Sequence, residues 1–133
     1  MSKKQARALF METVYTLVSV KAQIGENPAI AMSYLEREGQ LGKPMNQKFY
    51  NRVVKPGHDA MKRTIQAMRP DIKDDQTLEI VVINVIAQCL MLRIGRNVIL
   101  KRLGKRTLTR KDIDKFASTI CEVSLRGIEG LSE

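Results

Sequence analysis

The stretch Leu78–Ile94, LEIVVINVIAQCLMLRI, decides the fold of this chain. Its apolar residues do not alternate with period two, and as a helix they would spread over nearly the whole circumference. Polar interruptions at Glu79, Asn84, Gln88 and Arg93 leave no run of about 20 uninterrupted apolar residues, so we expect no membrane span. The stretch is typical of a helix that is covered on more than one side.

Helical periodicity continues on both sides of this stretch. Towards the N-terminus, apolar residues recur at three- and four-residue steps and predict a first helix. Breaks at glycine, proline and capping residues divide this half of the chain. The predicted elements are a helix at Lys3–Ile24, a short helix from Asn27 to Glu38, a loop at Gly39–Pro44, and a helix from about Asn46 to Met68 with a kink or a new start near Lys55, because Pro56 removes one backbone donor.

The C-terminal half is predicted to hold two long helices. Asp74 or Asp75 caps the first, which runs to about Leu103 and is bent or divided at Gly95. Gly104 ends that helix. Thr109 and Asp112 have the spacing of a capping box, which opens a last helix that runs to about Leu131.

The fold class is therefore all-α. We find no internal repeat and no strand-forming cluster bounded by turn residues. The 133 residues fit one domain, over residues 1–133, folded as a bundle of about five to six helices. This length buries a core without a disulfide or metal, and Cys89 and Cys121 are predicted to be small core residues in a reducing, cytoplasmic environment.

No pattern of catalytic or metal-binding residues is present. His58 is the only histidine, and it has no neighbouring ligand set or nucleophile. Glu36 and Glu38 are a carboxylate pair, but ordinary ion pairing explains them better than acid–base chemistry. We therefore expect a protein that is not an enzyme and that needs no cofactor or metal.

The net charge of +9 favours anionic partners. Six cations cluster between the last two helices, and they would suit nucleic-acid phosphates or an acidic partner, although such runs are often only solvated corners. No aromatic residue interleaves them, so we expect no sequence-specific DNA recognition. The six are Lys101, Arg102, Lys105, Arg106, Arg110 and Lys111.

A helix that is apolar all round is difficult to cover within one small bundle. A second chain would cover what the first cannot, which predicts a homodimer built on the last two helices. The alternative is a central helix wrapped by its own neighbours. Asn84 and Gln88 share one face of this helix, and their amides need partners across an interface or in a pocket.

Several segments resemble the C-terminal ligand-binding and dimerisation domain of TetR-family transcriptional regulators. The similar subgroup includes the regulator of cefoperazone and chloramphenicol sensitivity. The segments that carry the resemblance are Tyr34–Glu38 with Pro44, Val53–Pro56, Ile86–Leu90 with Arg93 and Arg96, Leu103–Gly104, Leu108–Thr109, Asp112–Ile113, Phe116 and Ser124–Ile128.

The resemblance implies a homodimer whose last two helices form a four-helix bundle with those of its partner. It also implies an effector pocket among the earlier helices and a helix-turn-helix head that binds DNA. We expect this chain to lack that head, because its first helix already resembles a ligand-domain helix.

From these arguments we predict two sets of residues. The dimer interface comprises Val82, Ile86, Leu90, Ile120, Leu125 and Ile128. The pocket for a small, largely apolar or anionic effector comprises Phe10, Val14, Tyr50, Met61, Gln88, Met91 and Leu92. Two other functions stay open: a basic helical module that binds nucleic acid, and an adaptor that forms mixed dimers with an intact regulator.

Overall fold

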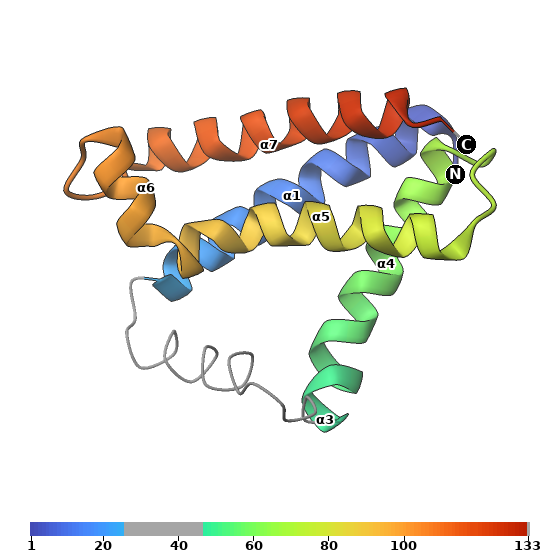
Figure 1. Ribbon diagram of the computed structural model, residues 1–133, viewed down its shortest axis with the longest axis horizontal. Helices are drawn as coiled ribbons and strands as arrows, with labels where there is room; N and C mark the ends of the chain where they lie inside the picture. Colours follow the sequence, from blue (N-terminus) through green and yellow to red (C-terminus); the bar gives the residue numbers. More distant parts are fainter. Residues whose placement is uncertain (26–46, 133) are drawn as a thin grey trace.

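A computed structural model describes residues 1–25 and 47–132 of the chain. The predicted helix from Asn27 to Glu38 and the predicted loop at Gly39–Pro44 lie outside these residues. The described elements are all helical, which confirms the all-α fold class (Figure 1). They are α1 (Lys3–Gly25), α3 (Gln47–Phe49), the π-helical turn η1 (Tyr50–Val54), α4 (Lys55–Met68), α5 (Asp75–Ile94), α6 (Arg96–Leu103) and α7 (Arg110–Gly130).

Helix α1 is the centre of the bundle, because it packs against α4, α5 and α7. Phe10, Val14 and Val18 follow one another at four-residue steps along α1 and are fully buried. This spacing places all three side chains on one helical face, which explains how one helix contacts the core over most of its length. Both chain termini lie at the same end of the bundle, and α6 lies at the opposite end (Figure 1).

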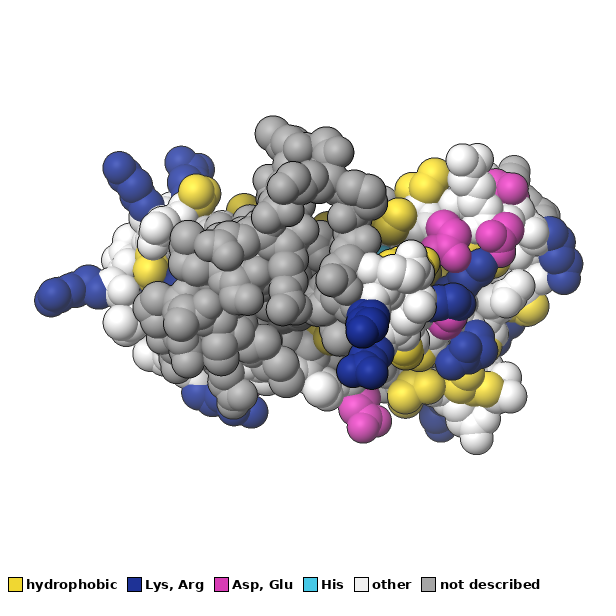
Figure 2. Space-filling view, turned by 90° about the horizontal axis from the view of Figure 1, so that it is seen from below, with side chains coloured by type: hydrophobic (Ala, Val, Ile, Leu, Met, Phe, Trp, Pro, Cys, Tyr) yellow, Lys and Arg dark blue, Asp and Glu magenta, His cyan; other side chains and the backbone are white. Residues whose placement is uncertain are grey.

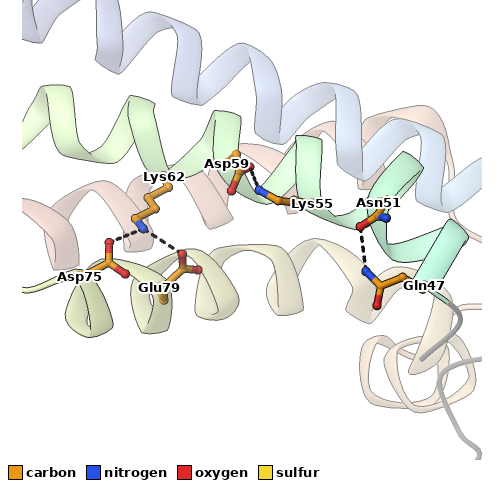
Figure 3. Close-up of polar contacts among 7 residues, drawn as sticks. All are labelled: Gln47, Asn51, Lys55, Asp59, Lys62, Asp75 and Glu79. Carbon is orange, nitrogen blue, oxygen red and sulfur yellow. Dashed lines mark hydrogen bonds and ion pairs between the residues drawn. The ribbon is translucent and has the colours of Figure 1, made fainter. Parts of the chain in front are cut away.

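The kink expected near Lys55 takes the form of a π-helical turn. The turn covers Tyr50–Val54, and α4 begins directly after it at Lys55, with Pro56 in its first turn. Proline has no backbone N–H and its ring displaces the preceding turn, so the regular hydrogen-bond ladder cannot pass through this position. In the first turn of α4, Lys55 donates a side-chain hydrogen bond to Asp59 Oδ2, one turn further along the helix, at 2.8 Å (Figure 3).

Glycines divide the chain at the two places predicted. Gly95 separates α5 from α6, and it is buried against the side chain of Met91. Gly104 ends α6 in the left-handed conformation, with φ of 66°. L-residues with a Cβ rarely adopt that backbone conformation, so glycine is the residue suited to this helix end.

Side-chain caps fix the starts of α5 and α7. Of the two candidate aspartates, Asp74 is the cap of α5, and its carboxylate accepts from the Thr77 amide at 3.1 Å. Thr109 and Asp112 form the predicted capping box, with reciprocal side-chain to backbone hydrogen bonds of 3.2 and 2.9 Å. Hydrogen bonds from Lys105 and from the Thr109 amide lower the pKa of Asp112 to about 2.

Residues 75–92 of α5 are, by length and composition alone, apolar enough to cross a membrane. The prediction from the polar interruptions was that no such segment exists. A single helix of this kind is weak evidence for a membrane span, because core helices of soluble proteins pass the same criterion. Here α5 packs against α1, α4 and α7.

Candidate functional site

Two hollows lie on the side of the bundle where α5 and α7 run next to each other. We call this side the α5/α7 face. The first hollow has a volume of about 370 Å³ and is lined by Thr77, Ile80, Val81, Asn84, Val85, Gln88, Val123, Ser124, Gly127, Ile128 and Leu131. The second has a volume of about 390 Å³ and is lined by Gln88, Leu103, Lys105, Asp112, Lys115, Phe116, Thr119, Ile120 and Val123. Gln88 and Val123 line both, so the hollows are adjacent.

Large aliphatic side chains on this face are exposed to solvent. Ile80 on α5 is 53% exposed and Val123 on α7 is 60% exposed. Ile83 on α5 is 54% exposed as well, but it lines neither hollow. Exposed aliphatic groups beside a hollow mark a candidate interaction surface, because covering them with another apolar surface lowers the free energy.

The two amides of α5 differ in their partners. Asn84 donates to the carbonyl oxygen of Ile80 in its own helix at 2.9 Å. Gln88 donates to Ser124 Oγ on α7 at 3.3 Å and so joins the two helices of the face. Ser124 is buried, so this contact gives its hydroxyl a partner inside the bundle.

The residues predicted for the dimer interface lie mostly inside one chain. Val82, Ile120, Leu125 and Ile128 are buried in the core cluster, and Ile86 and Leu90 are half-buried. The exposed residues of the same two helices, Ile80, Ile83 and Val123, were not singled out from the sequence. Val82 and Ile83 are neighbours in the chain, and the sequence gives no reason to orient one inward and the other outward.

The residues predicted for the effector pocket fall into three environments. Phe10, Val14, Met61 and Leu92 belong to the buried core cluster of the bundle. Tyr50 and Met91 are about 40% exposed, and the Met91 side chain lies against Gly95. Gln88 faces α7 and lines both hollows. The structure therefore brings four of the seven into one core and places the other three apart from it.

Arg96 is a residue to which the sequence assigned no role in a site. Its Nη1 atom is buried and has no hydrogen-bond partner within the described part of the chain. A guanidinium nitrogen that is removed from water without a partner is unfavourable, so this position would be stabilised by an anionic group. Arg96 begins α6 directly after Gly95, at the end of the bundle away from the termini (Figure 1). Two sequence features could have pointed to it: its place beside a helix-dividing glycine, and its place among the residues that carry the family resemblance.

Polar contacts join α4 to α5 near the end of the bundle that holds both termini (Figure 1). Lys62 contacts Asp75 and donates to Glu79 Oε1 at 3.0 Å (Figure 3). Both carboxylates accept hydrogen bonds from Lys62, and these contacts, the one to Asp75 more than the one to Glu79, raise the pKa of Lys62. The three groups form a salt-bridged connection between two helices. Among residues 1–25 and 47–132, no cluster of His, Cys, Asp and Glu could hold a metal ion.

Comparison with known proteins yields one family. The C-terminal domain of the HTH-type transcriptional dual regulator CecR matches residues 9–128, which is most of the chain and all four long helices of the described bundle. No curated protein and no solved structure matches the chain. The resemblance drawn from the sequence is thereby confirmed at the level of the family. The chain belongs to the family of the C-terminal domain of the HTH-type transcriptional dual regulator CecR.

Proposed function

We propose that this chain is the regulatory part of a transcriptional regulator, that it forms a homodimer through the α5/α7 face, and that it binds a small effector. Its role is regulatory and not catalytic, and its place is the cytoplasm. DNA would be reached through a helix-turn-helix segment, which the described residues do not include. The single observation that carries the proposal is the exposed aliphatic surface along α5 and α7.

The dimer is supported by the chemistry of that surface. Ile80 and Val123 are each more than half exposed and line the hollows, and most of the side chains that line the first hollow are aliphatic. Covering such a surface with an identical one stabilises a dimer by roughly 25 cal/mol for each Å² of apolar area removed from water. A two-fold arrangement places the same patch on both copies, so one apolar face is sufficient.

Two residues of the predicted interface, Ile120 and Ile128, line the hollows together with the exposed residues Ile80 and Val123. Val82 and Leu125 line neither hollow and are buried in their own chain. Ile86→Glu is a poor test of the dimer, because Ile86 packs against the core and a carboxylate there would also destabilise a single chain.

The effector part of the proposal is supported by Arg96. A guanidinium nitrogen at the junction of α5 and α6 that finds no partner in residues 1–25 and 47–132 favours a ligand with an anionic group. Leu92 precedes Arg96 by four residues and, like Phe10 and Val14 on α1, is fully buried in the core, so none of these three side chains offers open surface to a ligand. The part of the effector that this proposal specifies is therefore its anionic group, and a carboxylate would pair with the guanidinium of Arg96.

The dimer is tested by the solution mass measured by light scattering across a range of concentrations. Val123→Glu should convert the dimer to a monomer, because it would place an unpaired carboxylate within the apolar interface. Val98→Glu is a matched control, since Val98 is 58% exposed, close to the 60% of Val123, but lies on α6 and lines neither hollow. A wild-type monomer, or two variants with the same mass as a wild-type dimer, would contradict the assignment.

The effector is tested by thermal unfolding with benzoate and octanoate, compared with their neutral amides. The carboxylates should raise the melting temperature of the wild type more than the amides do, because only the carboxylates pair with Arg96. Arg96→Met should remove that difference, whereas Arg102→Met, a change at an exposed arginine of the same helix, should keep it. If carboxylates still raised the melting temperature of Arg96→Met more than the amides do, Arg96 would not be part of the binding site.

A further inference from the structure

The corner formed by the end of α6, the following loop and the start of α7 carries a concentrated positive charge. We call residues 101–115 the basic corner. It holds seven cationic side chains and two carboxylates, which leaves a surplus of five positive charges. All seven are exposed: Lys101, Arg102, Lys105, Arg106, Arg110, Lys111 and Lys115.

Only two of these cations are paired. Lys105 contacts Asp112 Oδ1 at 2.6 Å, and Arg110 contacts Asp114 Oδ1 at 3.3 Å. The other five have no ion pair within the described part of the chain. The Lys105–Asp112 contact ties the loop to the first turn of α7, so the cations of both helices lie at one corner of the molecule.

This corner projects from one end of the bundle. In Figure 1, α6 and the start of α7 lie at the end away from both termini. Figure 2 shows dark blue side chains projecting from that end with no carboxylates among them on the visible face, whereas carboxylates and cations are interspersed at the other end. Like charges this close repel one another, and the repulsion is relieved by a polyanion that displaces small counterions.

The chemistry of the corner suits a phosphate backbone. The exposed amide of Asn97 and the exposed hydroxyl of Thr107 accompany the cations, and such groups contact phosphates beside Lys and Arg. A lipid surface would also require an apolar wedge. Two large aliphatic residues of α6 are exposed, Val98 at 58% and Leu103 at 53%, but they lie five residues apart on different sides of the helix, and Leu103 lines a hollow of the α5/α7 face. Nucleic acid is thus favoured over a membrane.

We propose that the basic corner binds the phosphate backbone of duplex nucleic acid without sequence preference. The basic corner contains no aromatic residue, and Phe116, which directly follows it, is half-buried in a hollow. Stacking on bases therefore contributes nothing here. Lys105 and Lys115 of the basic corner also line the second hollow of the α5/α7 face, whereas Lys101, Arg102, Arg106 and Lys111 line neither hollow and stay accessible when that face is covered. The basic corner would hold the regulatory domain against nucleic acid by charge alone.

The test is fluorescence anisotropy of a labelled duplex of about 20 base pairs with the full chain, at salt concentrations from about 50 to 200 mM. Five phosphate contacts predict that log K falls against log salt with a slope of about 4 to 5. Two duplexes of unrelated sequence should bind equally well. Absence of binding at the lowest salt, or a marked preference for one duplex, would overturn the proposal.

A charge-matched pair of variants locates the site. Lys101→Glu/Arg102→Glu/Arg106→Glu should weaken binding at least tenfold and lower the slope by about 3, in line with the number of contacts removed. Lys3→Glu/Lys4→Glu/Lys73→Glu makes the same change in net charge at exposed positions outside the corner and should retain most of the binding. Equal losses in both variants would assign the effect to net charge and refute a site.

Two further measurements keep these outcomes distinct. The milder Lys101→Gln/Arg102→Gln/Arg106→Gln variant, with its helical circular dichroism unchanged, should still lose affinity, which separates charge from unfolding. Vesicles of anionic phospholipid should not compete with the duplex, and a chain that binds them while leaving the duplex free would contradict the choice of nucleic acid. Light scattering of the same samples reports on the dimer independently.

Discussion

The guanidinium of Arg69 donates a hydrogen bond to the backbone carbonyl oxygen of Ile128 at 2.7 Å. Arg69 follows the last residue of α4, and Ile128 lies in the last turn of α7. The same side chain is held by a bidentate contact with Asp71, and this contact lowers the pKa of Asp71 to about 2. One arginine therefore joins two helix ends that are 59 residues apart in the chain.

Arg69→Gln should destabilise the bundle. The substitution removes a charge-assisted hydrogen bond to the end of α7, and such bonds contribute about 1.5 to 3 kcal/mol. The free energy of unfolding, measured by urea denaturation, should fall accordingly. Arg126→Gln is the control, because Arg126 is largely exposed and its ion pair among the described residues is with Glu122 of its own helix. Equal effects of the two substitutions would mean that the Arg69 contact to α7 adds no stability.

The capping box of α7 should give the protein an acid-sensitive stability. The pKa of Asp112 is about 2 in the folded chain and near 3.8 without its partners, so its ionised form stabilises the fold above pH 3.8. That contribution is lost as the pH falls from about 4 towards 2. The melting temperature measured across this range should therefore decline less steeply for Asp112→Asn than for the wild type. A parallel decline in both proteins would show that the carboxylate is not coupled to folding.

Val82→Ala should be markedly destabilising. Val82 is fully buried on α5, so the substitution removes buried methyl groups and leaves a cavity, with an expected loss of about 1.5 to 3 kcal/mol. Val98→Ala, at a site that is 58% exposed, should change stability by less than about 0.5 kcal/mol. Urea denaturation measures both. A small effect at Val82 would place its side chain outside the core.

Lys62→Met should have little effect on stability but change its dependence on salt. The ammonium group bridges Asp75 and Glu79, yet the two carboxylates are substantially exposed, so screening limits what the contacts contribute. The free energy of unfolding should depend less on salt in the variant than in the wild type. Identical salt dependence would indicate that the connection between α4 and α5 is not electrostatic.

The helix boundaries illustrate what local sequence predicts well. Thr109 and Asp112 lie three residues apart, and Gly104 adopts the backbone conformation that a helix end requires, so each signal acts within about one turn. The π-helical turn at Tyr50–Val54 was expected only as an unspecified kink near Lys55. Pro56 indicates that the α-helical hydrogen-bond pattern is interrupted, but packing of the surrounding helices decides whether a kink, a break or a π-helical turn results.

The candidate site illustrates where local sequence is insufficient. The apolar character of α5 predicted correctly that this helix has many apolar neighbours, but adjacent residues such as Val82 and Ile83 have similar side chains and opposite environments. The orphaned nitrogen of Arg96 depends equally on its surroundings, because a sequence does not reveal which polar atoms become buried without a partner.

The sequence by itself determined that the chain is helical, where its described helices begin and end, and which family it resembles. The reason is that capping, glycine and proline effects involve residues within about four positions of one another. The tertiary structure decided which side of α5 is buried and which side, with α7, remains exposed. That choice depends on the packing of α1, α4 and α7 against α5, and these helices come from separate parts of the chain and meet only when the whole bundle forms.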